Sequence, residues 1–267
     1  MSIIIDSASL IGKRKTNEDK HVIFCNINGK DKTKIAANIY AIFDGHGGRF
    51  VSKFLSDYMV QIMTHPKVKL PLTRSFATKV IRFLQSYLKK NYYQNAKEVG
   101  STCLFAVHFI KNYKEYLNII NVGDSRCILC KKNKYIPLTI DHKPNYPTER
   151  ERILNLGGKI IYDAGEYRVQ NLSLSRAIGD ISAEPYVTCD PDLWKYSIVH
   201  EDKFIIFGCD GLFEGIPDIQ ELIGFILANA YDKTGVRTTN KIAKKLAEYA
   251  IQRGSTDNVS VIIVFLR

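Results

Sequence analysis

Short apolar runs rich in Ile, Val, Phe and Tyr alternate with polar turns along this chain, and a few longer segments repeat their apolar residues with the period of an α-helix. We expect strands at residues 22–26, 35–43, 104–110, 116–122, 204–207 and 259–266, and helices at residues 50–63, 72–95, 148–156, 218–230 and 239–253. The expected helices come in pairs between groups of strands. This grouping favours an α+β fold with largely antiparallel sheets over a regularly alternating βαβ fold.

Composition and cysteine usage limit the class of protein. The 267 residues are 45% hydrophobic and 24% charged, which is ordinary for a globular chain, and no linker divides them, so we expect a single domain over residues 1–267. No basic segment precedes the apolar N-terminal residues, and no apolar run approaches the roughly 18 residues of a membrane span. The six cysteines lie mostly inside apolar runs, as reduced thiols do. We therefore expect an intracellular monomer, cytoplasmic or nuclear, without a membrane partner.

Cys127 and Cys130 form the only CxxC pair of the sequence. No second pair of Cys or His lies nearby, and on a strand the two side chains would point to opposite faces. Structural thiols are therefore favoured here over a zinc or redox site.

Positive charge is concentrated in the first half of the chain. Residues 1–134 contain 23 Lys and Arg against 9 Asp and Glu, a net charge of +14, whereas residues 135–267 carry −3. In the expected helix 72–95, apolar side chains repeat at positions 76, 80, 83 or 84, and 87, which places Lys79, Arg82 and Lys90 on the opposite, solvent-facing side. This basic patch is either an ordinary solvated helix face or a docking surface for an anionic partner.

Three apolar runs end in an aspartate with a glycine beside it: Asp44 after residues 39–43, Asp124 after residues 116–122, and Asp210 after residues 204–207. Taken singly, an Asp-Gly after a strand is more often a tight turn. Its recurrence favours a cluster of carboxylates instead. Asp257 directly precedes the expected strand 259–266, so this strand must run antiparallel to the others if all four carboxylates share one end of a sandwich.

Such a cluster predicts a particular chemistry. Carboxylate and carbonyl oxygens favour hard cations such as Mg²⁺ or Mn²⁺, because zinc sites usually recruit His or Cys. Two such ions about 3.5 to 4 Å apart can make hydroxide from a bridging water and neutralise phosphate oxygens. Glycines beside the ligands let the main chain approach the ions closely. The sequence therefore predicts metal-assisted hydrolysis, most naturally of a phosphoester.

Eight short motifs follow one another along the chain. They are Arg14-Lys-Thr-Asn-Glu18-Asp19, Phe43-Asp-Gly-His-Gly-Gly48, Gly100-Ser-Thr102, Asn121-Val-Gly-Asp-Ser-Arg126, Asp141-His-Lys-Pro144, Leu172-Ser-Leu-Ser-Arg-Ala-Ile-Gly-Asp180, Cys209-Asp-Gly211 and Ser255-Thr-Asp-Asn-Val259. In kind and order they resemble those of the metal-dependent serine/threonine protein phosphatases of the PPM, or type 2C, family.

The resemblance covers essentially the whole chain and has definite implications. It implies a four-layer α-β-β-α sandwich, in which helices flank two mainly antiparallel central sheets, with a binuclear Mn/Mg centre at one end. It also implies hydrolysis of phosphoserine and phosphothreonine in phosphoprotein substrates by direct attack of a metal-activated water, with no covalent phosphoenzyme.

The resemblance also assigns the metal ligands. Asp44 resembles the carboxylate that bridges the two metals, and Asp210 and Asp257 would complete one metal site. The second site would use Asp44, the main-chain carbonyl of Gly45, and Glu18 through water.

Three further residues resemble the catalytic groups of the family. Asp19 would orient metal-bound waters. Arg14 resembles the phosphate-binding arginine, because guanidinium pairs bidentately with phosphate oxygens, although residues 13–15 can also be read as a generic basic cluster. His46 resembles the general acid that protonates the departing Ser or Thr oxygen, and the alternative is a histidine that only orders its loop.

Two positions bear on a weaker third metal, and one segment bears on specificity. Asp124 resembles a residue that, with Asp210, helps to hold a third metal in some relatives. Glu214 stands where many members have Asp, and Phe213 replaces the usual Trp. Glu can also ligate Mg²⁺ or Mn²⁺ through its longer side chain.

Residues 145–171 correspond to the flap on the substrate side of the site.

Two functions from other classes stay open. A non-catalytic relative would keep the fold and bind a partner, but such proteins typically lose the metal carboxylates or the phosphate arginine, which this chain retains. The basic first half is also compatible with association with nucleic acid. No recognisable nucleic-acid module is present, however, and the aromatic residues of the basic segment are mostly explained as core.

Overall fold

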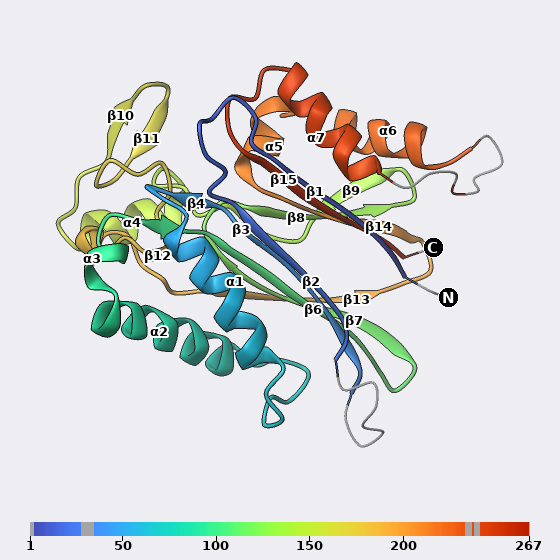
Figure 1. Ribbon diagram of the computed structural model, residues 1–267, viewed down its shortest axis with the longest axis horizontal. Helices are drawn as coiled ribbons and strands as arrows, with labels where there is room; N and C mark the ends of the chain where they lie inside the picture. The colour runs from blue at the N-terminus through green and yellow to red at the C-terminus, as the bar shows by residue number, and fades with distance from the viewer. Residues whose placement is uncertain (1–2, 28–34, 233–236, 238–240, 267) are drawn as a thin grey trace.

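The computed structural model describes residues 3–27, 35–232, 237 and 241–266 and arranges them in four layers (Figure 1). Two five-stranded sheets lie face to face in the middle, and helices cover the outer face of each sheet. One sheet is covered by α1 (Phe50–Met63) and α2 (Arg74–Asn91), and the other by α5 (Asp210–Gly215), α6 (Ile219–Ala230) and α7 (Ile242–Gln252). The expected α-β-β-α sandwich is confirmed.

Both sheets are antiparallel throughout. In the first, the order is β2 (Lys20–Ile27), β3 (Ala37–Phe43), β6 (Cys103–Lys111), β7 (Lys114–Val122) and β13 (Asp192–Ile198). In the second, the order is β1 (Ile4–Leu10), β15 (Val259–Phe265), β14 (Asp202–Gly208), β8 (Arg126–Lys131) and β9 (Lys134–Pro137). The two ends of the described chain therefore pair with each other in β1 and β15.

The central strands are buried on both faces, which explains their nearly continuous apolar sequences. In β3, Ile39, Ala41 and Phe43 belong to the core beneath α1 and α2, whereas Tyr40 and Ile42 belong to the core between the sheets. Residues of β15 alternate in the same way between the layer of α5 to α7 and the sheet interface. Three apolar cores thus hold four layers together.

The CxxC pair lies in β8. Cys127 belongs to the core between the sheets and Cys130 to the core beneath the helices, and both are free thiols. The opposite orientation expected for two strand residues three apart is confirmed.

The helices follow the expected ranges with small differences. The helix expected at residues 72–95 is divided into α2 and the short α3 (Tyr93–Ala96), α4 spans Pro147–Asn155, and the expected start of α7 at residue 239 lies outside the described residues. The buried face of α2 was expected to include Phe83 or Leu84. Leu84 is buried, whereas Phe83 is 56% exposed. None of the helices in the described part of the chain is both long and apolar enough to cross a membrane.

Candidate active site

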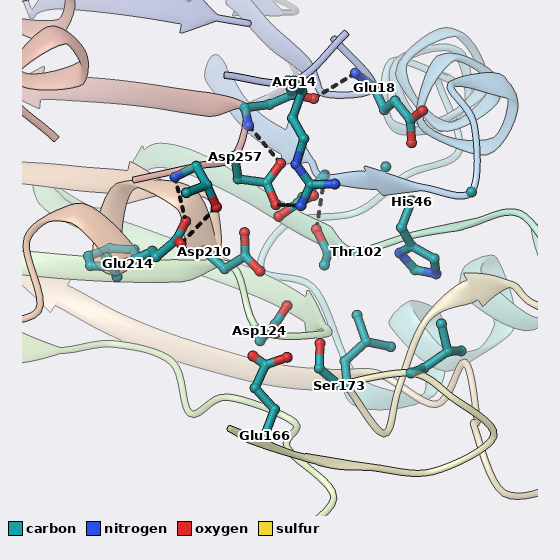
Figure 2. Close-up of a pocket in the computed structure, with 18 of the residues that line it drawn as sticks. Arg14, Glu18, His46, Thr102, Asp124, Glu166, Ser173, Asp210, Glu214 and Asp257 are labelled. Atoms are coloured by element: carbon teal, nitrogen blue, oxygen red, sulfur yellow. Dashed lines mark hydrogen bonds and ion pairs between the residues drawn. The ribbon is translucent and has the colours of Figure 1, made fainter. Parts of the chain in front are cut away.

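A cavity of about 1050 Å³ opens at one end of the sandwich, where strands of both sheets end (Figure 2). Asp44 follows β3, Asp124 follows β7, and Asp210 begins α5 just after β14. Asp257 precedes β15, and it reaches the same cavity because β15 runs antiparallel to β14. The four strand-end carboxylates singled out in the sequence therefore line one cavity.

Asp44 and Asp210 lie close together. One carboxylate oxygen of each, and the Sγ of Cys209, lie within 4.8 Å of one another. Burial raises the pKa of Asp44, and the charge of Asp210 raises it further. Burial, with the charges of Asp124 and Asp257, raises the pKa of Asp210 to about 7. Oxygen donors that repel one another in this way fit a divalent cation such as Mg²⁺ or Mn²⁺, whose charge would relieve the repulsion.

The main chain at Asp44 is held in place by its neighbours. The N–H of Asp44 donates to Thr102 Oγ1 at 3.0 Å, and the N–H of Thr102 donates back to the Asp44 carbonyl at 2.9 Å. A Cβ at Gly45 would lie 2.5 Å from the carbonyl oxygen of Glu18 and 2.9 Å from Ser52 Oγ. Only glycine allows the 44–45 segment to pack this closely against residue 18.

Asp19 is buried beside the acidic cluster and does not itself line the cavity. It is almost fully buried, and Ser260 Oγ donates to its Oδ2 at 2.6 Å. Burial raises the pKa of Asp19 to about 6, the hydrogen bond from Ser260 opposes this, and the charge of Asp257 adds to it. Asp19 is therefore electrostatically part of the same cluster.

Glu18 lines the same cavity but binds the loop beside it. Its Oε2 accepts from the N–H of Gly48 at 3.0 Å and its Oε1 from Thr16 Oγ1 at 3.2 Å, while its own N–H donates to Asn258 Oδ1 at 2.9 Å. The carboxylate thus anchors the glycine-rich turn after β3. A ligand role through water is compatible with this position.

Arg14 stands at the rim of the cavity with 57% of its side chain exposed. Its Nη2 donates to Asp257 Oδ2 at 2.6 Å, and Figure 2 shows the guanidinium turned towards the acidic cluster. Arg14, which resembles the phosphate-binding arginine of the family, is therefore directed into the site.

His46 is positioned by a small third sheet. This sheet joins β4 (Gly45–His46), β5 (Gly100–Ser101) and β12 (Ile178–Gly179), with His46 paired to Gly100 and Gly179 paired to Gly100 from the other side. His46 Nε2 lies 2.7 Å from Oδ2 of Asp180, the residue that follows β12. Burial alone would lower the pKa of His46, but the hydrogen bond and the charge of Asp180 outweigh it and raise the pKa.

The residues considered for a third metal already have partners. The ammonium of Lys143 forms an ion pair with Asp124, which is almost fully buried. The carboxylate of Glu214 accepts from the N–H of Thr256 at 3.1 Å, from Thr256 Oγ1 at 3.0 Å and from Ser255 Oγ at 3.2 Å. Glu214 also lines the cavity, but its carboxylate binds the 255–256 turn.

Asp180 and Lys143 are site residues that were not predicted from the sequence, although both lie inside motifs of the family, Leu172–Asp180 and Asp141–Pro144. Asp180 had a recognisable signal. The segment Ala177-Ile-Gly-Asp180 repeats the pattern of an apolar run followed by Gly-Asp that marks Asp124. Lys143 carries no such signal, because a lone lysine in a loop is common.

Comparison with known proteins agrees with this geometry. The family model described as Protein phosphatase 2C matches residues 5–259. This chain belongs to the protein phosphatase 2C family, a family of serine/threonine phosphatases.

Two curated relatives illustrate the match. A PP2C-like domain-containing protein of Acanthamoeba polyphaga mimivirus is 41% identical over 171 residues, which are 57% of this chain and 95% of that protein. The probable protein phosphatase 2C 76 of Arabidopsis thaliana is 34% identical over 265 residues, which are 97% of this chain and 58% of the plant protein. The chain spans about half to two thirds of the length of several plant relatives that it matches.

Solved structures share the architecture. A sex-determining protein of C. elegans superposes with a TM-score of 0.81 at 26% identity, covering 100% of this chain and 65% of that one. A serine-threonine phosphatase 2C of Toxoplasma gondii superposes with a TM-score of 0.80 at 21% identity, covering 98% of this chain and 94% of that one. The second likeness concerns the fold alone.

Proposed function

We propose that this chain is a metal-dependent phosphatase that removes phosphate from phosphoserine and phosphothreonine in proteins. The observation that carries the proposal is the convergence of four carboxylates in one cavity with the Arg14 guanidinium at its rim. Carboxylates hold the cations that neutralise phosphate, and guanidinium pairs with phosphate oxygens. Membership of the phosphatase 2C family supports the same reaction.

Two Mn²⁺ or Mg²⁺ ions would be held by residues of this cavity. One would lie among Asp44, Asp210 and Asp257, and the other among Asp44, the Gly45 carbonyl and Glu18. When bound, the ions supply a nucleophile from water for direct attack on phosphorus and offset the charge of the phosphate. The raised pKa values of Asp44 and Asp210 support this assignment, because the cluster lacks enough positive charge of its own.

A weaker third ion would lie at Asp124, with Asp210 and Glu214 as its other ligands. It would have to replace the ammonium of Lys143 beside Asp124 and draw Glu214 away from Thr256. Both rearrangements cost free energy. This supports a third site of lower affinity than the first two.

The remaining site residues act on the substrate and on protons. Arg14 exchanges its ion pair with Asp257 for the oxygens of the incoming phosphate and so orients the phosphate. His46, fixed by Asp180, gives a proton to the departing Ser or Thr oxygen. Asp19, buried beside the cluster, would orient the metal-bound waters.

We also propose the setting in which this reaction takes place. The substrates are phosphoproteins, and the enzyme works as an intracellular monomer, in the cytoplasm or the nucleus, through one catalytic domain. Six free cysteines support a reducing compartment. The basic face of α2 at Lys79, Arg82 and Lys90 is proposed to attract anionic partners.

Phosphate release from a phosphothreonine peptide tests the proposal. Purified protein is assayed with Mn²⁺, with Mg²⁺ and with EDTA, beside Asp210→Ala and the control Asp57→Ala, which removes an exposed aspartate of α1 that does not line the cavity. We expect turnover that requires metal, disappears in Asp210→Ala and persists in Asp57→Ala. A folded wild-type protein that binds metal without turnover would overturn the proposal in favour of a non-catalytic binding protein.

A further inference from the structure

A row of aromatic side chains lines the seam between α1 and α2. We call this row the aromatic seam; its members are Phe50, Phe54, Tyr58, Phe83, Tyr87 and Tyr92. Neighbouring ring centroids are 4.4 to 6.3 Å apart. Helical spacing explains the row, because residues four apart stack along one side of each helix.

The aromatic seam is more exposed than packing of the fold requires. Only Phe54 is buried, the tyrosines and Phe50 are half-buried, and Phe83 is 56% exposed. Single exposed apolar residues are common on protein surfaces, but contiguous ones mark interaction sites more often. Phe83 is contiguous with Tyr87, so the exposed ring extends a larger apolar surface.

Free positive charge flanks the exposed end of the seam. Lys79 and Lys90 lie four residues before and seven residues after Phe83, on the same side of α2, and both are exposed. Neither forms an ion pair with any residue that the structure describes. Arg82, by contrast, pairs with Asp190 at 2.9 Å. Of the three residues in the basic patch expected from the sequence, Lys79 and Lys90 therefore have charges that are not already paired.

The sequence has no Asp or Glu between Asp57 and Glu98. The acidic residues that pair with α2 come from residues 184–192 and bind Arg74, Arg82 and Lys89, which leaves the charges of Lys79 and Lys90 unpaired within the described structure. A partner that carries carboxylates would gain favourable electrostatic energy on approach and at contact. A partner that also carries a ring or an aliphatic side chain would cover Phe83 and Tyr87. Both features are found together in acidic protein segments that contain apolar residues.

The seam leads towards the catalytic cavity. Tyr92 contacts Phe50 with ring centroids 5.4 Å apart, and Phe50 begins α1 directly after the glycine-rich turn that carries His46. Figure 1 shows the start of α1 and the end of α2 at the same end of the sandwich as β4 and β12. A polypeptide that places a phosphorylated residue in the cavity can therefore continue onto the seam.

We propose that the aromatic seam, with Lys79 and Lys90, docks an acidic segment of the phosphoprotein substrate that carries an apolar or aromatic side chain and lies outside the phosphorylated site. This inference rests on the proposed phosphatase function. It gives a role to two of the lysines in the basic first half of the chain, which the catalytic motifs do not require.

The test compares a short phosphothreonine peptide with two longer versions that carry a Glu-rich, Phe-containing extension on one side or the other. The seam variants are Phe83→Ala and the double variant Lys79→Glu with Lys90→Glu. The matched control is Lys111→Glu with Lys114→Glu, which makes the same charge change at exposed positions of the β6–β7 hairpin. A small aryl phosphate reports on catalysis without docking.

We expect at least one extension to lower KM for wild-type enzyme by about tenfold, which corresponds to 1.4 kcal/mol, with kcat unchanged. Both seam variants should remove most of this gain, while the control variant and all rates on aryl phosphate stay as in wild type. The gain should also shrink when salt is raised from about 50 to 300 mM, because the lysines are exposed. An extension that never lowers KM, or a gain that survives both seam variants, overturns the inference.

Binding of the unphosphorylated extension, measured by fluorescence anisotropy, separates this inference from the proposed function. If wild-type enzyme lacks turnover on aryl phosphate, the phosphatase proposal fails, and anisotropy still decides whether the seam binds an acidic segment. Tighter binding of a random RNA than of the extension, lost in the same seam variants, would contradict the choice of a protein partner.

Discussion

Asp180 holds His46 from 134 residues away, with its Oδ2 2.7 Å from Nε2 of the imidazole. The pair fits over Gly100, where a Cβ would lie 2.0 Å from Asp180 Oδ2 and 2.6 Å from His46 Nε2. A carboxylate at this distance fixes the ring orientation and the nitrogen that carries the proton. Asp180 is thus a positioning residue for the proposed general acid.

Asp180→Asn should weaken this positioning. We expect kcat on a phosphothreonine peptide to fall by about 10- to 100-fold, with KM nearly unchanged, because general acid catalysis contributes about 10²- to 10⁴-fold and loss of the orienting carboxylate removes only part of it. The loss should be smaller on an aryl phosphate, whose leaving group needs less help from a proton. Steady-state kinetics on both substrates check this, and an equal loss on both would show that Asp180 supports only the fold.

Gly100→Ala provides a second route to the same displacement without changing either polar group. The added methyl group must push the carboxylate and the imidazole apart. We expect the same substrate-dependent loss of kcat, and circular dichroism should show that the variant folds. Wild-type kinetics in this variant would contradict the close packing of the pair.

Asp210→Asn should separate metal binding from stability. The pKa of Asp210 is raised to about 7, above the ordinary 3.8, so the folded protein favours the protonated form. Its contribution to stability is complete below pH 3.8 and is lost as pH rises towards 7. In EDTA at pH 8, Asp210→Asn should therefore melt at a higher temperature than wild type.

Adding Mn²⁺ should make wild type melt at a higher temperature than Asp210→Asn. The ion stabilises the wild-type carboxylate cluster and has one ligand fewer in the variant. Thermal unfolding with and without Mn²⁺ checks both statements. Asp57→Asn, at an exposed position, should melt like wild type in both conditions. A lower melting temperature of Asp210→Asn in EDTA would contradict the repulsion inferred here.

Glu214 is proposed to ligate only the weaker third ion, and at the two main metal sites it is expected to act through the 255–256 turn that leads to Asp257. Glu214→Ala removes three hydrogen bonds and should raise the Mn²⁺ concentration for half-maximal activity about fivefold, as expected for a loss near 1 kcal/mol. Glu214→Gln keeps an oxygen that accepts from Thr256 N–H and should stay close to wild type. Glutamine as harmful as alanine would instead indicate direct ligation of a metal.

Glu149 makes the fold sensitive to acid. Burial would raise its pKa, but hydrogen bonds from Arg176, Ser175 and Arg152 and the Arg176 charge lower it to about 2, below the ordinary 4.5. The ionised carboxylate therefore contributes about 3 kcal/mol of stability above pH 4.5, which is lost as pH falls towards 2. Urea unfolding should give Glu149→Gln a much lower free energy of unfolding than wild type at pH 7. This difference in free energy should become smaller towards pH 3. A difference that stays constant with pH would contradict the ionised state of Glu149.

The interior of the fold was predictable because strands buried on both faces leave long apolar runs, as in β3 and β15. Four strands of the two main sheets were not expected and lack that signal. β1 and β13 are edge strands with half-buried polar residues, β9 is an edge strand of four mostly exposed residues, and β8 is six residues long and begins with an arginine and ends with a lysine. Their place depends on partners far along the chain, which local periodicity does not report.

The candidate site was predictable to the extent that each residue follows or precedes a recognisable strand. Asp44, Asp124, Asp210 and Asp257 have this property. Asp180 follows β12, and β12, β4 and β5 contain two residues each, so they are too short to show any period. The contact between Asp180 and His46 exists only once these three segments have met.

The interior position of β15 has a consequence for synthesis of the protein. β15 lies between β1 and β14, and in the described structure β1 pairs with no strand except β15. At about 5 to 20 residues per second, a ribosome exposes residues 4–10 many seconds before residues 259–265. During most of its synthesis, the growing chain therefore has a sheet edge that β15 does not yet pair with, and its set of cavity carboxylates is incomplete. Such an exposed edge favours aggregation during that interval, and the cavity cannot contain all four of its carboxylates until Asp257 has been synthesised.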